Sequence, residues 1–96
     1  MDIKIKRKED GSFSVAGSLN FSRGGYAIVS VECEKNYDQL LLKSDAISYL
    51  NEIASNQGMR VSKTEGAQAA IPVKVERGES ARVRYVEFPV EILPNP

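Results

Sequence analysis

Two hydrophobic periodicities divide the chain, one typical of strands and one typical of a helix. Most segments alternate apolar and polar residues with a period of two, as half-buried strands do. Residues 44–58 instead repeat apolar side chains at spacings of three and four, which predicts an amphipathic helix. Ser44 or Asp45 is suited to cap the start of this helix, and Gly58 is suited to end it. We therefore expect one helix that lies on one β-sheet.

Before the helix, the alternation predicts three strands that follow one another as a meander. These strands are expected at residues 2–8, 12–21 and 26–34. Asp10 and Gly11 form a strong hairpin signal between the first two strands, and a serine- and glycine-containing turn separates the second from the third. The third strand carries apolar side chains on both faces, which indicates a central position in the sheet.

The segment between the third strand and the helix is ambiguous. We expect residues 35–38 to form a loop. Leu40, Leu41 and Leu42 fit either a short buried strand or an earlier start of the helix. The strand is favoured, because Ser44 and Asp45 are better helix caps than the residues upstream.

After the helix, the alternation predicts two or three further strands, at residues 59–63, 69–77 and 81–92. Pro72 cannot donate a hydrogen bond to a neighbouring strand, which places it on an edge strand or at a bulge. In the last strand the apolar pattern changes phase between Tyr85 and Val86, which indicates a β-bulge or a passage from one packing environment to another.

This element order defines the expected fold, a single domain over residues 1–96. The favoured fold is α+β: an antiparallel sheet of five to seven strands, in the order βββ(β)αβββ, with the helix packed on one face. The alternative is an OB-like five-stranded barrel, in which a helix typically falls between strands 3 and 4.

The composition limits the catalytic and metal-binding chemistry that the chain can carry. The chain carries 13 basic and 13 acidic side chains, so its net charge requires no polyanionic partner. It has no histidine, which removes the commonest general base and the commonest metal ligand. Its one cysteine, Cys33, lies in the apolar pattern of the third strand, where we expect it to be buried and free. We therefore expect a protein that is not an enzyme and that uses no cofactor and no metal.

The sequence also bears on the compartment. No apolar run approaches the length of a membrane span, and no signal-peptide core follows Met1. We therefore expect a cytoplasmic protein with no membrane partner, or one in the host cytoplasm if the chain is viral.

The first group of candidate binding residues is Lys4, Lys6 and Lys8, which share one face of the first strand. Three ammonium groups on one face can accept phosphates or an acidic protein. Lysine on an exposed strand also prevents edge-to-edge pairing, and this protective interpretation is favoured.

The second candidate group is Arg23 and Tyr26. Arg23 is followed by two glycines and flanked by Phe21 and Tyr26, which resembles a single unit of an RNA-binding Arg-Gly-Gly segment. A glycine-rich hairpin loop closed by a Phe21–Tyr26 pair is the favoured interpretation.

The third candidate group lies on the last hairpin. It consists of Lys74, Arg77, Arg82 and Arg84. If the fold is the OB-like barrel, these basic side chains beside Tyr85 predict a groove that binds nucleic acid. Ion pairs of Glu76 with Arg82 or Arg84 are the favoured interpretation.

The function that fits these observations best is a non-enzymatic protein-binding module with mixed-charge surfaces. By analogy, such modules include virus-encoded inhibitors and accessory factors, phage proteins among them, that cover a partner's surface. The alternative function is a single-stranded nucleic-acid-binding protein of OB-like type. Edge strands can pair with a partner or with a second copy, so a homodimer is a further alternative.

Overall fold

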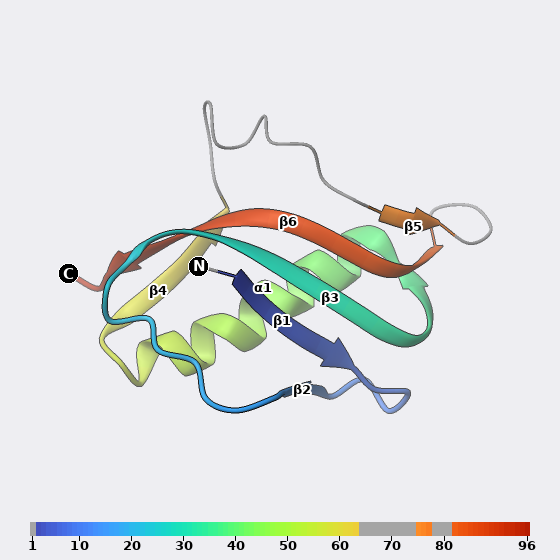
Figure 1. The fold of residues 1–96 in the computed structure, drawn as a ribbon, viewed down its shortest axis with the longest axis horizontal. Helices are drawn as coiled ribbons and strands as arrows, with labels where there is room; N and C mark the ends of the chain where they lie inside the picture. The colour runs from blue at the N-terminus through green and yellow to red at the C-terminus, as the bar shows by residue number, and fades with distance from the viewer. Residues whose placement is uncertain (1, 64–74, 78–81) are drawn as a thin grey trace.

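The computed structural model describes residues 2–63, 75–77 and 82–96 of the chain. Within these residues one helix lies across one face of a β-sheet (Figure 1), which makes the protein a small α+β domain. The elements are β1 (Asp2–Arg7), β2 (Phe13–Val15), β3 (Gly25–Asp38), α1 (Gln39–Ser55), β4 (Met59–Lys63), β5 (Val75–Arg77) and β6 (Arg82–Pro94).

The sheet is mixed. Its strand order is β2-β1-β3-β6-β4, and β5 also pairs with β6. β1 and β3 are parallel, whereas the other pairs are antiparallel, so the prediction of an antiparallel sheet is right only in part. The predicted meander is wrong, because β1 lies between β2 and β3. The OB-like barrel is also wrong, because among the described strands β2 and β4 end the sheet on opposite sides and do not close it.

β2 is much shorter than predicted because the chain leaves the sheet after Val15. Gly17 has a φ of 82°, a left-handed conformation that favours glycine. Beyond Gly17, the side chain of Gln57 holds the chain near the end of α1. Its Oε1 accepts a hydrogen bond from the Phe21 N–H at 2.7 Å, and its Nε2 donates to the Leu19 carbonyl at 2.7 Å. This detour returns the chain to the other end of the sheet, where β3 starts parallel to β1 (Figure 1).

β3 is longer than predicted and α1 begins earlier than predicted. Residues 35–38, expected as a loop, belong to β3. Asp38 then caps α1, since its Oδ1 accepts from the backbone N–H groups of Leu40 and Leu41 at 3.0 and 3.1 Å. The strand expected at Leu40, Leu41 and Leu42 is therefore wrong: these residues form the first turn of the helix. Leu42 is buried, but Leu40 and Leu41 are 77% and 65% exposed.

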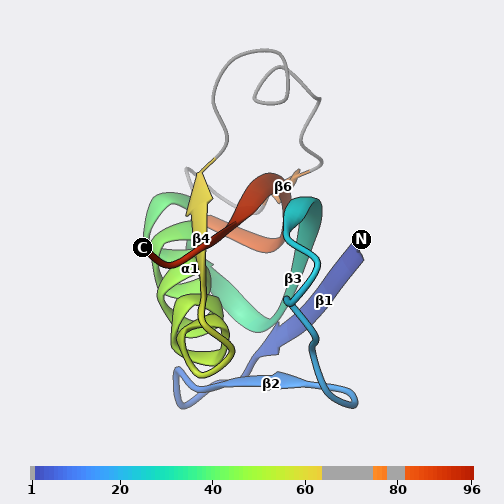
Figure 2. The same ribbon diagram turned by 90° about the vertical axis from the view of Figure 1, so that its left-hand side faces the viewer.

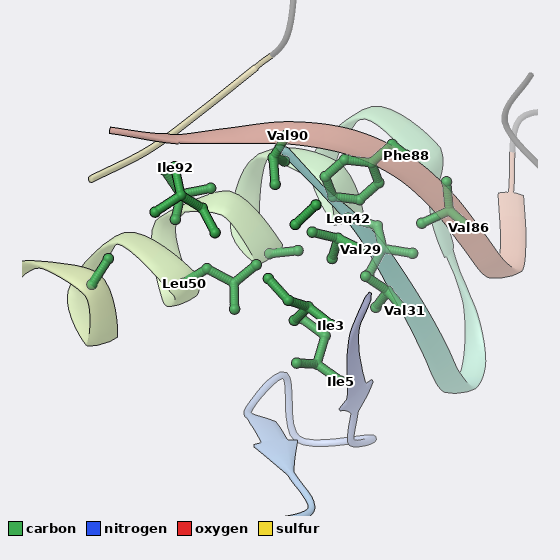
Figure 3. Close-up of a cluster of buried hydrophobic side chains, with 14 of the residues drawn as sticks. Ile3, Ile5, Val29, Val31, Leu42, Leu50, Val86, Phe88, Val90 and Ile92 are labelled. Atoms are coloured by element: carbon green, nitrogen blue, oxygen red, sulfur yellow. The ribbon is translucent and has the colours of Figure 1, made fainter. Parts of the chain in front are cut away.

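The hydrophobic core fills the space between α1 and the inner face of the sheet (Figure 3). The helix contributes buried residues at four-residue spacing, namely Leu42, Ala46, Leu50 and Ala54. The sheet contributes alternate residues of its central strands, including Ile3, Ile5, Val29, Val31, Phe88 and Val90. Cys33 is buried on the same face, as predicted. The expected helix stripe and the inner faces of the first and third strands are thus confirmed.

β6 contains the predicted change of phase. Val83 and Val86 are both fully buried although they lie three positions apart. The register between β3 and β6 shifts at this point: Tyr85 stands opposite Glu32, but Val83 stands opposite Tyr37. Residues 33–36 of β3 therefore bulge out against a single residue of β6. Within β6, Arg84 is the extra residue against β5, because Tyr85 stands opposite Glu76 and Val83 opposite Arg77, which confirms the bulge expected in the last strand. Pro72, predicted at an edge or bulge, lies outside the described residues.

Candidate functional site: the outer face of the sheet

No described helix or strand covers the face of the sheet opposite α1 (Figure 2). Because successive side chains of a strand point to opposite faces, alternate residues of β1, β3 and β6 form this surface. We call it the outer face. Its side chains include Lys4, Lys6, Tyr26, Ile28, Ser30, Glu32, Tyr85, Glu87 and Glu91.

The strand register decides which of these side chains are neighbours. Two adjacent rows cross the strands: Lys4, Ser30 and Glu87 form the first, and Lys6, Glu32 and Tyr85 form the second. In the first row Ser30 Oγ donates to Glu87 Oε1 at 3.0 Å. Both rows contribute to the lining of a hollow of about 320 Å³. The outer face therefore carries Lys4 and Lys6 beside Asp2 on β1, and only acidic charged side chains on β3 and β6 among those named above.

Lys4, Lys6 and Lys8 are all exposed, and the first two share the outer face. Lys8 lies beyond the end of β1. Lys6 Nζ is 3.8 Å from Glu34 Oε1, an exposed ion pair of the kind that contributes little to stability. β2 pairs only with residues 5–7 of β1. Edge protection by lysine can therefore apply to the first half of β1 only.

The structure does not form the expected hairpin around Arg23. The loop joins β2 to β3, which are not neighbours in the sheet. Phe21 is fully buried, whereas Tyr26 is 52% exposed and stands opposite Glu91, so no Phe21–Tyr26 pair closes the loop. Arg23 and Tyr26 instead belong to a hollow of about 400 Å³, lined by Asn20, Arg23, Gly24 and Tyr26.

Arg84 and Tyr85 line one hollow of about 160 Å³ together with Glu32 and Cys33, so an acidic side chain stands beside Arg84 there. The guanidinium groups of Arg82 and Arg84 bind the bulged segment of β3. Arg82 Nη2 donates to the Asn36 carbonyl at 2.6 Å, and Arg84 Nη2 donates to the Glu34 carbonyl at 3.1 Å. A bulge leaves backbone groups without a ladder partner, so the two arginines supply hydrogen bonds that β6 cannot.

The other members of the third candidate group are described only in part. Lys74 lies outside the described residues. Arg77 belongs to β5 and stands opposite Val83, but its side chain and that of Glu76 lie outside the described part of the chain. The expected ion pairs of Glu76 therefore remain a prediction.

A cluster around Arg7 escaped the sequence analysis. The Arg7 guanidinium lies between the rings of Phe13 and Tyr37, 5.2 and 4.5 Å from their centroids, and Phe13 stacks on Tyr49 at 5.2 Å. Arg7 Nη1 donates to Asp45 Oδ2 at 2.7 Å. Burial opposes the charge, but the hydrogen bond to Asp45 and the negative charge of that carboxylate outweigh it and hold the pKa of Arg7 above its ordinary value. The cluster ties β1, β2 and β3 to α1.

One feature of the sequence could have revealed this cluster. Arg7 occupies the position after Ile3 and Ile5 on the apolar face of the first strand, where a charged residue needs a partner of opposite charge. The partner, Asp45, lies 38 residues away, so local pattern could not identify it.

The described residues offer little catalytic chemistry. Burial raises the pKa of the Cys33 thiol to about 11, which keeps it protonated and unreactive at neutral pH. Over residues 2–63, 75–77 and 82–96, no three histidine, cysteine, aspartate or glutamate side chains are grouped to hold a metal ion.

In the same part of the chain, no helix has the length and apolar character needed to cross a membrane.

The outer face is thus the candidate site of this domain. It is open to solvent, and its charged side chains are of both signs and lie in neighbouring rows. Comparison with protein-family models, with curated proteins and with solved structures finds no match for this chain.

Proposed function

We propose that this domain is a non-enzymatic protein-binding module that acts through the outer face of its sheet. The observation that carries the proposal is that each of the two rows holds one lysine from β1 and one glutamate from β3 or β6. A protein surface with the opposite pattern of charges would complement it. By analogy with small virus-encoded inhibitors and accessory factors, the module would act by covering its partner's surface.

The distribution of charge disfavours a nucleic acid as the partner. A phosphate backbone that contacted Lys4 and Lys6 would also meet Glu32 and Glu87. Arg23 and Tyr26 lie elsewhere, and Tyr26 stands opposite Glu91. A protein that binds single-stranded nucleic acid along its length needs a basic groove that follows the phosphate backbone. The basic side chains named here do not form such a groove.

The test compares two charge-reversal variants. Lys4→Glu/Lys6→Glu changes the basic side of the outer face, and both side chains are exposed, so the fold should persist. Lys35→Glu/Lys63→Glu is the control, because it reverses two exposed basic side chains outside the two rows of the outer face and changes the net charge equally. A partner captured from the native host is purified, and its binding to each protein is measured.

The proposal predicts that Lys4→Glu/Lys6→Glu binds the purified partner about tenfold or more weakly than the wild type, while the control binds within about twofold. The difference should shrink as salt rises, because the charges are exposed. Equal binding by all three proteins would reject the outer face as the contact surface. A labelled oligonucleotide that bound tightly, with steep salt dependence, would reject the protein-binding proposal itself.

A further inference from the structure

We propose that an extended, acidic segment of the protein partner adds a strand to the open edge of β1. This inference rests on the proposed function. It names the kind of partner segment that would pair with the edge of β1 and place its acidic side chain over the outer face. The open edge is the first half of β1, residues 2–4. β2 pairs with residues 5–7 of β1, and no other described strand continues that pairing.

The edge is open because β2 ends early. Val15, opposite Ile5, is the last residue of β2 that pairs with β1. Gly17, with its φ of 82°, then turns the chain away, and Gln57 holds the departing segment at the end of α1. Figure 1 shows the chain diverging from β1 beyond β2. The first half of β1 is therefore left beside solvent, and Asp2 and Lys4 are exposed.

The backbone of Lys4 faces this open edge. The Lys8 N–H donates to the Ser12 carbonyl at 2.8 Å, so the backbone groups of Lys8 point toward β2. Backbone groups of alternate residues point to the same side of a strand, which directs those of Lys6 and Lys4 the same way. Lys6 stands opposite Ser14, whereas Lys4 stands opposite no described strand residue. An edge residue with free N–H and C=O groups is a template for another strand.

The side chains indicate the chemistry of the incoming strand. A residue directly opposite Lys4 would lie about 5 Å from it on the outer face, with Lys6 at a diagonal distance of about 7–8 Å. A carboxylate there would complement both lysines. The neighbouring residues of the incoming strand would point to the face that carries Ile3, which is the core face. The matching segment therefore alternates acidic and apolar residues and runs antiparallel to β1, in line with β2.

A different edge fits less well. On β4, the Val61 N–H already donates to Asn51 Oδ1 of α1 at 2.6 Å, so the helix occupies a backbone donor of that edge. A second copy of the chain is the competing occupant of the β1 edge. Paired antiparallel about Ile3, it would place its own Asp2 opposite Lys4, so light scattering has to separate it from the acidic segment.

The probe is a capped heptapeptide of alternating glutamate and valine, with glutamate at both ends. Titrated into the isotopically labelled full chain, it should shift the Lys4 amide signal and slow its hydrogen exchange at least fivefold. The same peptide with lysine in place of glutamate should not bind. Lys4→Ser/Lys6→Ser should bind the acidic peptide about fivefold to tenfold more weakly, the loss of two exposed charge pairs.

Two methylated peptides separate strand addition from simple charge attraction. The residue opposite Lys4 would exchange both backbone hydrogen bonds with it, and that residue is a glutamate. N-methylation of the glutamates removes the donors that face β1, whereas N-methylation of the valines removes only donors that face away. The glutamate-methylated peptide should bind at least fivefold more weakly, and the valine-methylated peptide should bind within about twofold of the parent.

Each other result would overturn the inference. Equal affinity of the two methylated peptides, signal changes at β4 in place of β1, or absence of binding would exclude strand addition at this edge. Light scattering that showed a wild-type dimer dissociated by the acidic peptide would assign the edge to a second copy. If the peptide fails but Lys4→Glu/Lys6→Glu still loses the purified partner, the outer face keeps its proposed function. If that variant binds the partner normally, the proposed function fails by itself.

Discussion

Replacement of Arg7 by alanine is expected to destabilise the domain by about 2–4 kcal/mol. Its guanidinium contacts two rings and is only 15% exposed, so each cation–π contact should contribute about 1 kcal/mol or more. The ion pair with Asp45, whose side chain is 49% exposed, adds about 0.2–1 kcal/mol. The aliphatic stem of Arg7 contributes further apolar packing.

A lysine at the same position separates charge from shape. Arg7→Lys keeps the positive charge near Asp45 but loses the planar group that stacks between Phe13 and Tyr37. We expect it to cost about 1–2 kcal/mol. Asp45→Asn removes only the ion pair and should cost below about 1 kcal/mol.

Urea unfolding followed by circular dichroism measures these differences. With a slope of about 1 kcal/mol per molar urea, Arg7→Ala should lower the midpoint by about 2 M or more. A change in unfolding free energy below about 0.5 kcal/mol would place Arg7 among ordinary surface residues and refute the structural role of the cluster. Equal stability of Arg7→Lys and the wild type would show that planar stacking contributes nothing.

Four further predictions concern the core and the detour after β2. Leu50→Ala should cost about 2–5 kcal/mol, and Leu41→Ala, in the exposed first turn of α1, below about 0.5 kcal/mol; urea unfolding that gave equal losses would contradict the position of the helix. Gln57→Ala should cost about 1–3 kcal/mol in the same assay, because it removes two hydrogen bonds, one of them partly buried. Cys33 should react with a thiol reagent far more slowly in the native protein than in denaturant. Its folded-state pKa of about 11 lies above the ordinary 9.0, so unfolding measured between pH 9 and 11 should show a loss of stability with rising pH that Cys33→Ala lacks.

The outer face shows how far the sequence reaches toward the site. Alternation alone places Lys4 and Lys6 together on one face of β1, and the structure confirms their exposure. The alternation does not reveal that Glu32 and Glu87 lie beside the two lysines, because their positions depend on the register of three strands distant in sequence. The character of the site therefore changes from a basic stripe to a mixed-charge surface only when the sheet is assembled.

The sequence by itself determined the elements whose pattern is local. Burial of one face imposes a period of two on strands such as β1 and β4 and a period of three to four on α1, so these elements, and the burial of Leu50 and Cys33, could be predicted.

Only the tertiary structure decided which strands pair and where the elements end. Asp38 and Ser44 are both good helix caps, and Asp38 caps α1 because β3 continues to it. β1 and β3 are parallel because the chain between them returns to the other end of the sheet, and on this path the backbone at Phe21 binds Gln57, 36 residues away in sequence. Such contacts leave no periodic trace in the chain, because their energy depends on atoms that meet only after the chain has folded.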